Sequence, residues 1–240
     1  MSIWKYANPS EFMRISSHAL APLWVISSAL LIIGIGWALF VIPDDYQQGS
    51  TVKILYIHVP AALLAINAYF VMAVASTIGL IRRHHVSFLV AKAAAPLGAA
   101  FTLIALITGA VWGQPMWGTW WVWDARLTSV LVMFFFYLGY MALWAAIEEP
   151  EKAADLSAVT CLVGVIFAFL SRYAVNFWAT LHQGASLSVQ EGQRIDDAFR
   201  MPLYICMAGF MALFVVLLLM RTRTEIRQRR LRALRLREAV

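Results

Sequence analysis

Six long apolar runs alternate with short polar segments along the chain. The runs cover residues 21–42, 54–81, 93–112, 127–147, 158–178 and 201–220. A helix needs about 20 consecutive, mostly apolar residues to cross the hydrocarbon core of a bilayer, and every run reaches that length. The pattern therefore predicts an all-α integral membrane protein with six transmembrane helices.

The composition agrees with this fold class. Of the 240 residues, 62% are hydrophobic and 13% are charged, whereas soluble domains carry about 45–50% apolar and about 25% charged residues. Six crossings leave room for little else, so we expect a single membrane domain, residues 1–240. The first 20 residues are polar and include Glu11 and Arg14. They do not form a cleavable signal peptide pattern.

The basic residues predict the orientation. Eight arginines crowd the tail, residues 221–240, and six more Lys and Arg lie in the other segments expected on the same side of the membrane. The opposite side carries only Lys53, Arg126, Arg194 and Arg200. Because positive charge is enriched on the cytoplasmic side, both termini are predicted to be cytoplasmic. A basic tail after an apolar run is typical of contact with anionic membrane lipid, so no nucleic-acid partner is expected.

The two cysteines carry no recognisable chemistry. Cys161 and Cys206 lie inside apolar runs and form no C-x-x-C motif. We interpret them as packing residues. Neither a thiol redox motif nor a covalent haem attachment motif is present.

The outward segment between the third and fourth runs, residues 112–127, is rich in tryptophan. It contains WGTWWVWDAR at 117–126, and half of the chain's ten tryptophans fall within twelve positions. These are Trp112, Trp117, Trp120, Trp121 and Trp123. If residues 117–126 form a short helix, Trp117, Trp120, Trp121 and Asp124 share one face and Trp123 points elsewhere. An interfacial aromatic belt explains one or two tryptophans. The density here favours a platform for a large, flat, apolar ligand.

Two of the five histidines are predicted on the same outer side as this platform. His58 lies just before Pro60 and should sit at or just before the start of the second helix, and His182 lies in the long segment after the fifth run. A zinc site needs three or four protein ligands, and no such spacing exists. Two imidazoles beside flat aromatic rings fit haem iron better, because the porphyrin supplies the other four ligands. A single histidine in a loop is more often a surface residue.

Haem carries two propionates, which require cations near the same face. Lys53, Arg126 and Arg172 are the candidates. A charge inside an apolar run is often functional, although Arg172 could equally extend to the membrane interface. Asp124 could pair with Arg126 or orient a histidine.

Two other function classes make different demands on the sequence. A cytochrome b-type electron carrier needs histidine pairs inside its helices, and the apolar runs contain only His58, at one edge. A secondary transporter of another solute is the alternative function. It predicts repeats and broken or charged helices near the midplane, and the sequence contains few such features.

The same motifs carry a resemblance to a known family. WGTWWVWDARLTS preceded by PM, together with YIHVPAA at 56–62 and TLHQG at 180–184, resembles the WWD-domain haem-handling family of system I cytochrome c maturation. Chain length and six crossings are similar to those of its haem exporter protein C (CcmC) members. The resemblance covers essentially the whole chain.

The resemblance implies a haem chaperone and export component rather than an enzyme. It implies His58 and His182 as axial ligands of a transiently bound haem b, and a platform of Trp117, Trp120, Trp121, Trp123 and Asp124. It also implies a place in the bacterial inner membrane. The implied partners are a periplasmic haem chaperone (CcmE-like), ABC transporter subunits (CcmA- and CcmB-like) and a small single-span subunit (CcmD-like).

Overall fold

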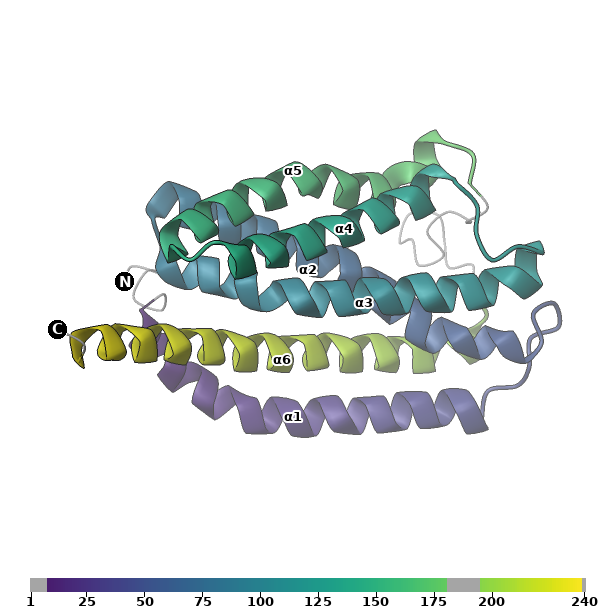
Figure 1. Ribbon diagram of the computed structural model, residues 1–240. Coiled ribbons are helices and arrows are strands. Elements are labelled where there is room, and N and C mark those ends of the chain that lie inside the picture. Colours follow the sequence, from purple (N-terminus) through teal and green to yellow (C-terminus); the bar gives the residue numbers. More distant parts are fainter. Residues whose placement is uncertain (1–7, 181–194, 239–240) are drawn as a thin grey trace.

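Six long helices run side by side in the computed structural model, which describes residues 8–180 and 195–238 (Figure 1). The helices are α1 (Pro9–Phe40), α2 (Leu55–Arg82), α3 (His85–Trp117), α4 (Ala125–Ala146), α5 (Pro150–Phe177) and α6 (Asp197–Glu238). A short 3-10 helix, η2 (Ser50–Ile54), leads directly into α2. Each long helix is apolar and long enough to cross a membrane. The described residues contain no β-strand, so the predicted all-α, six-span fold class is confirmed.

Several helices extend beyond the apolar runs that predicted them. α1 begins at Pro9 rather than near residue 21, because the Asn8 side chain caps it by accepting a hydrogen bond from the Ser10 N–H at 2.9 Å. α6 continues through the basic tail to Glu238. Hydropathy marks where a helix meets lipid. The end of a helix depends instead on capping and on helix propensity, which is high for Arg, Leu, Ala and Glu.

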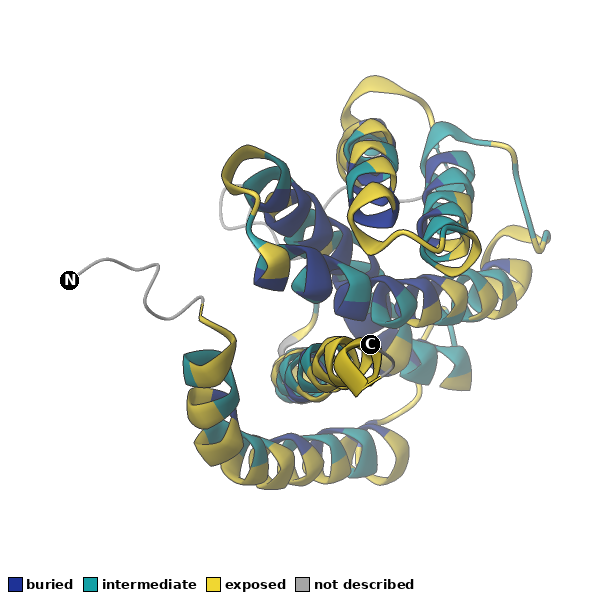
Figure 2. Cartoon of the chain, turned by 60° about the vertical axis from the view of Figure 1, so that its left-hand side comes forward, coloured by how far each residue is buried: buried dark blue, intermediate teal, exposed yellow. Residues whose placement is uncertain are grey.

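The helices form two groups. α2, α3, α4 and α5 pack together, whereas α1 packs along α6 and barely touches α2 (Figures 1 and 2). α6 lies between α1 and the α2–α3 pair. Buried residues therefore concentrate on α2 and α3, while much of α1 is exposed (Figure 2).

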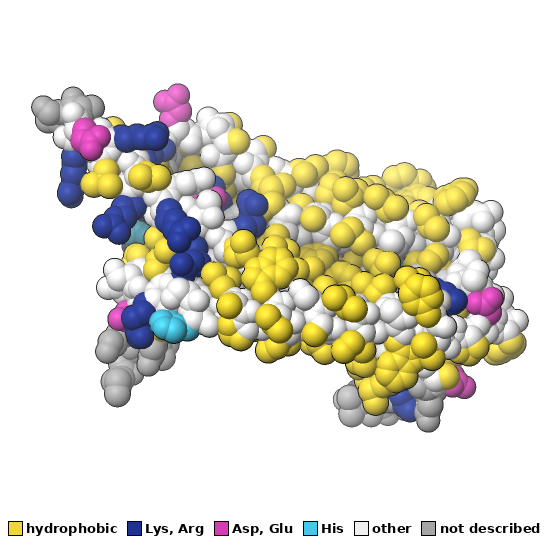
Figure 3. Space-filling view, turned by 90° about the horizontal axis from the view of Figure 1, so that it is seen from below, with side chains coloured by type: hydrophobic (Ala, Val, Ile, Leu, Met, Phe, Trp, Pro, Cys, Tyr) yellow, Lys and Arg dark blue, Asp and Glu magenta, His cyan; other side chains and the backbone are white. Residues whose placement is uncertain are grey.

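The antiparallel succession of helices gives the bundle two chemically different ends. We call the end where α3 stops and α4 starts the tryptophan end, because it carries the loop 118–124. The other end, with Arg82, Arg83 and the arginines of residues 221–237, is called the arginine end. Figure 3 shows basic side chains gathered at the arginine end and hydrophobic side chains over most of the remaining length.

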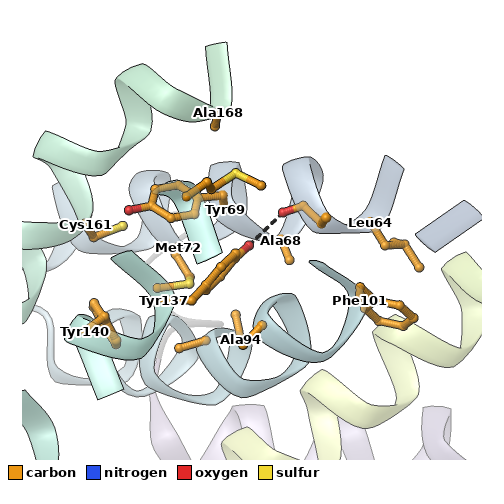
Figure 4. Packing of buried hydrophobic residues seen from close by; sticks show 14 of the residues in the cluster. Leu64, Ala68, Tyr69, Met72, Ala94, Phe101, Tyr137, Tyr140, Cys161 and Ala168 are labelled. Atoms are coloured by element: carbon orange, nitrogen blue, oxygen red, sulfur yellow. Dashed lines mark hydrogen bonds between the residues drawn. The ribbon is translucent and has the colours of Figure 1, made fainter. Parts of the chain in front are cut away.

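Tyrosines and small residues organise the core of α2 to α5. The Tyr137 hydroxyl of α4 donates a 2.8 Å hydrogen bond to the Ala65 carbonyl of α2 (Figure 4). Gly98 of α3 lies directly beneath the Tyr137 ring, where a larger residue would collide with it. Both cysteines are buried and free, in agreement with their predicted packing role.

Removing this hydroxyl tests the α2–α4 contact. Tyr137→Phe is expected to lower the free energy of unfolding by about 1 kcal/mol, because the Ala65 carbonyl loses a partner inside the bundle. Unfolding in detergent, titrated with SDS and followed by circular dichroism, measures the change. Tyr46→Phe is the control, since Tyr46 is 91% exposed. Equal stability of the two variants would contradict a structural role for the bond.

Candidate ligand-binding site at the tryptophan end

The candidate residues that the structure describes lie at the tryptophan end, on six different segments. They are Lys53 of η2, His58 of α2, Trp117 at the end of α3, Trp120, Trp121, Trp123 and Asp124 of the loop, Arg126 of α4, and Arg172 of α5. His182 lies outside the described residues.

The decamer 117–126 is not a helix, which corrects the helical interpretation of its spacing. Gly118 ends α3 with a left-handed φ of 75°, and its N–H bonds the Gln114 carbonyl. α4 starts only at Ala125, and the Oδ1 of its N-cap residue Asp124 accepts a hydrogen bond from the Leu127 N–H at 2.7 Å. The predicted segment 112–127 therefore narrows to a loop of residues 118–124. Its two ends are set by a glycine and a capping carboxylate rather than by aromatic periodicity.

Gly118 provides a local test of this geometry. Gly118→Ala should destabilise the turn by about 1 kcal/mol, because a residue with a Cβ is strained at positive φ. Limited proteolysis of the loop in detergent measures the effect as faster cleavage. Gly139→Ala within α4 is the matched control, since an added Cβ there meets nothing within 4 Å. Equal cleavage rates in both variants would show that the turn is not strained.

The loop presents its indoles unequally. Trp123 is 76% exposed, Trp120 60% and Trp117 39%. Trp121 is half-buried and meets Trp123 edge to face, with ring centroids 5.5 Å apart. The Trp121 indole N–H is buried and makes no hydrogen bond within the described part of the chain. The loop thus offers a large exposed aromatic surface with one unsatisfied donor, which an interface belt does not require.

Two hollows adjoin this aromatic surface. A small one lies between Trp117, Trp120 and Trp121 and the last turns of α3, including Gly109. A wide, open one of about 370 Å³ lies between Trp123 with its neighbours and residues 179–180, which follow α5. Ligand sites usually measure about 300–1,000 Å³. The second hollow has that size.

His58 is held from the side by α3. It is the fourth residue of α2 and lies in the first turn, slightly inside the helix rather than at or just before its start as expected. η2 runs directly into α2, and the helix begins before Pro60 rather than at it. The His58 Nδ1 lies 3.0 Å from the Thr108 Oγ1. A Cβ added to Gly109 would lie 3.0 Å from the imidazole Cε1. The close approach of the imidazole to α3 therefore depends on a glycine.

Trp112 supports the same imidazole from another direction. Its ring meets His58 edge to face at a centroid distance of 5.7 Å and an angle of 77°. Its indole N–H donates to Gln48 Oε1 at 3.0 Å, which ties it to the segment before η2. Trp112 is therefore a support for His58 rather than part of the loop surface.

Two cations stand beside the loop. Arg126 is half-buried at the start of α4, and Arg172 is exposed on α5, close to the Tyr173 ring. The two guanidinium groups are within electrostatic reach of each other, and Asp124 partly offsets the charge of Arg126. Neither arginine forms a salt bridge in the part of the chain that the structure describes. Two neighbouring positive charges of this kind favour an anionic ligand.

Lys53 occupies a different environment. Its Nζ donates to the Leu39 carbonyl at the end of α1 at 3.2 Å, and it lies 3.8 Å from Asp44 Oδ1. These contacts tie η2 to α1. Of the three candidate cations, Lys53 is thus the one already engaged in a structural contact with a carboxylate.

Sequence reasoning did not identify Thr108, Gly109 and Trp112 as the surroundings of His58, or Gln48 as the partner of Trp112. The spacing of Thr108, Gly109 and Trp112 could have indicated them. It places a hydroxyl, a position without a side chain and an aromatic ring within about one helical turn. Only the pairing of α2 with α3 shows that this group faces a histidine.

The donor set fits one class of ligand. Among residues 8–180 and 195–238 there is no group of three or more His, Cys, Asp or Glu that could hold a metal ion. An imidazole, exposed indoles and two guanidinium groups remain, and these suit a flat, apolar ligand with negative charges that brings most of its own metal ligands. Fold and site thus define a six-span membrane protein with an exposed, indole-lined surface at one end.

Comparison with known proteins assigns the chain to a family. A family model described as "Heme exporter protein C" matches residues 2–237, so the chain belongs to the heme exporter protein C family. It is 64% identical over 241 residues to heme exporter protein C of Paracoccus denitrificans and 60% identical to that of Rhodobacter capsulatus, with 99% of each chain covered. It is 43% identical to the Escherichia coli K12 protein, with 93% of this chain and 92% of the relative covered.

Proposed function

We propose that the chain binds haem at its tryptophan end and delivers it to a haem chaperone during cytochrome c maturation. The observation that carries this proposal is the non-helical loop 118–124. It exposes its indoles beside Arg126 and Arg172, two positively charged side chains that lie near each other. The printed name of the relatives, heme exporter protein C, supports haem as the ligand.

Each residue type has a defined task in this proposal. His58 and His182 serve as axial ligands. Haem supplies the four ring nitrogens around its iron and two propionate groups. Trp117, Trp120, Trp121 and Trp123 bury part of the porphyrin face, at roughly 25 cal/mol per Å² of apolar surface removed from water.

The propionates are assigned to Arg126 and Arg172 first. Guanidinium groups bind carboxylates with two parallel hydrogen bonds, and neither of these two already holds a carboxylate in a salt bridge within the described residues. Lys53 is retained as a further candidate for the same task, with a smaller expected contribution because of its contact with Asp44. Asp124 acts as the helix cap that sets the position of Arg126, two residues later.

The exposure of the loop supports transient rather than permanent binding. Trp120 and Trp123 are mostly exposed, and of the two adjoining hollows one is too small to enclose a porphyrin and the other is open. A ligand on such a surface leaves once one axial bond is lost, whereas a ligand enclosed by a helical bundle is retained. The chain itself catalyses no reaction in this scheme. It holds haem b and presents it to a partner.

The proposed setting is the bacterial inner membrane, with both termini cytoplasmic and the tryptophan end on the periplasmic side. The concentration of Arg at the opposite end supports this orientation. The proposed partners are a membrane-anchored, CcmE-like haem chaperone, CcmA- and CcmB-like ABC transporter subunits, a CcmD-like single-span subunit and anionic membrane lipid.

A haem titration of the purified chain tests the proposal. The absorption spectrum should show a low-spin, six-coordinate haem. When the haem-free form of the haem chaperone is added, the haem should leave this chain and be recovered bound to the chaperone. A chain that leaves the spectrum of free haem unchanged would refute haem binding and favour a transporter of another solute.

A further inference from the structure

The hydrogen bonds of Thr108 fix the direction of its contact with His58. The Thr108 Oγ1 lies 2.6 Å from the Ile104 carbonyl, one helical turn earlier on α3. A carbonyl oxygen only accepts, so the single hydroxyl hydrogen of Thr108 is donated to it. The same oxygen lies 3.0 Å from the His58 Nδ1. Towards the histidine the hydroxyl therefore accepts a hydrogen bond, and Nδ1 donates it.

This direction determines the tautomer of the neutral imidazole. A neutral histidine carries one hydrogen on one of its two ring nitrogens. If Nδ1 carries it, the lone pair is on Nε2. The nitrogen available to bind a metal is generally set by the hydrogen bond that the other nitrogen makes.

The surroundings restrict the rotation of the ring as well. Trp112 meets the imidazole edge to face, and Gly109 allows Cε1 to approach the α3 backbone. The donor–acceptor pair with Thr108 thus acts on a ring that is already confined on two sides.

We propose that Thr108 is a positioning residue that holds His58 as the Nδ1–H tautomer and directs Nε2 to its ligand. The identity of that ligand as haem iron rests on the proposed function. The tautomer does not, because it is inferred from the hydrogen bonds of Thr108 on α3.

Substitution separates the hydroxyl from the shape of the side chain. Thr108→Val keeps the branched shape but removes the acceptor, and it should allow the Nε2–H tautomer to appear. Loss of such a support to a metal-binding histidine lowers metal affinity by about 10- to 100-fold, so haem affinity should fall by at least about tenfold. Thr108→Ser restores the hydroxyl and should recover most of that loss. Thr77→Val is the matched control, since Thr77 makes the same type of bond to the Ala73 carbonyl without a histidine partner.

The tautomer is measured without haem. Nitrogen-15 NMR of the full chain in detergent, labelled at histidine, distinguishes the two forms, and loss of one signal in His58→Gln assigns the residue. The Nδ1–H form is expected in the unsubstituted chain and in Thr108→Ser. An Nε2–H form in the unsubstituted chain would overturn the proposal, and this measurement needs no variant other than the assignment control. An unchanged tautomer or haem affinity in Thr108→Val would also overturn it.

The two proposals fail in different ways. If the NMR result is as expected but His58→Ala leaves the haem spectrum unchanged, the role of His58 as an iron ligand is lost and the tautomer assignment stands. If His58→Ala removes the low-spin haem spectrum but His58 of the unsubstituted chain is the Nε2–H form, His58 remains an iron ligand and the proposed role of Thr108 is refuted.

Discussion

Replacement of His58 by alanine is expected to abolish the low-spin haem spectrum of the purified chain. The substitution removes one proposed axial ligand, and no other described histidine lies at the tryptophan end. Affinity for haem should fall at least about tenfold, which corresponds to about 1.4 kcal/mol. Absorption titration in detergent measures both the spectrum and the affinity.

The controls use the remaining histidines. His182→Ala should reproduce the loss, because the proposal places both imidazoles on one iron. His18→Ala should leave the spectrum intact, since His18 lies on the first turns of α1, near the arginine end, with its Nδ1 against the Arg14 carbonyl. A low-spin spectrum that persists in both His58→Ala and His182→Ala would exclude the proposed pair of ligands.

Loss of the two arginines beside the loop is expected to remove recognition of the propionates. The Arg126→Gln/Arg172→Gln double variant should bind haem about tenfold more weakly, because hydrogen bonds to charged groups contribute about 1.5–3 kcal/mol and exposure reduces that value. The low-spin spectrum itself should remain at high haem concentration, since the imidazoles are untouched. The two effects distinguish anion recognition from iron ligation.

Haem with both propionates esterified sharpens this test. The unsubstituted chain should prefer free-acid haem to the diester, and the double variant should lose that preference. Lys53→Gln should change the preference less, because Lys53 already contacts Asp44. Arg83→Gln is the matched control, since Arg83 pairs with Asp155 at the arginine end. A preference that survives the double substitution would show that other groups hold the propionates.

The helices could be predicted because the apolar runs are long. The third run, for example, lies within α3. The ends of the helices could not be located in this way. Gly118 stops α3 through a positive φ, and Asp124 starts α4 through a cap, neither of which changes the hydropathy pattern. A helical spacing of tryptophans was present in the decamer, but these two local signals overrode it.

The residue types of the candidate site could be predicted from the sequence, but their arrangement in space could be predicted only in part. His58, the loop tryptophans and Arg126 attract attention because polar or aromatic residues interrupt apolar surroundings. Thr108 does not stand out in the sequence, because a threonine whose hydroxyl donates to a carbonyl of its own helix is common in apolar helices.

The sequence by itself determined the six-span class, the separation of basic charge to one end and the presence of an aromatic segment, because all three depend on local composition. Tertiary structure decided which side chains meet. α2 and α3 bring Thr108, Gly109 and Trp112 around His58, and α4 and α5 bring Arg126 within electrostatic reach of Arg172. Contacts between helices depend on the packing of small residues such as Gly98 and Gly109 against rings from a neighbouring helix, and spacing along one helix does not encode that pairing.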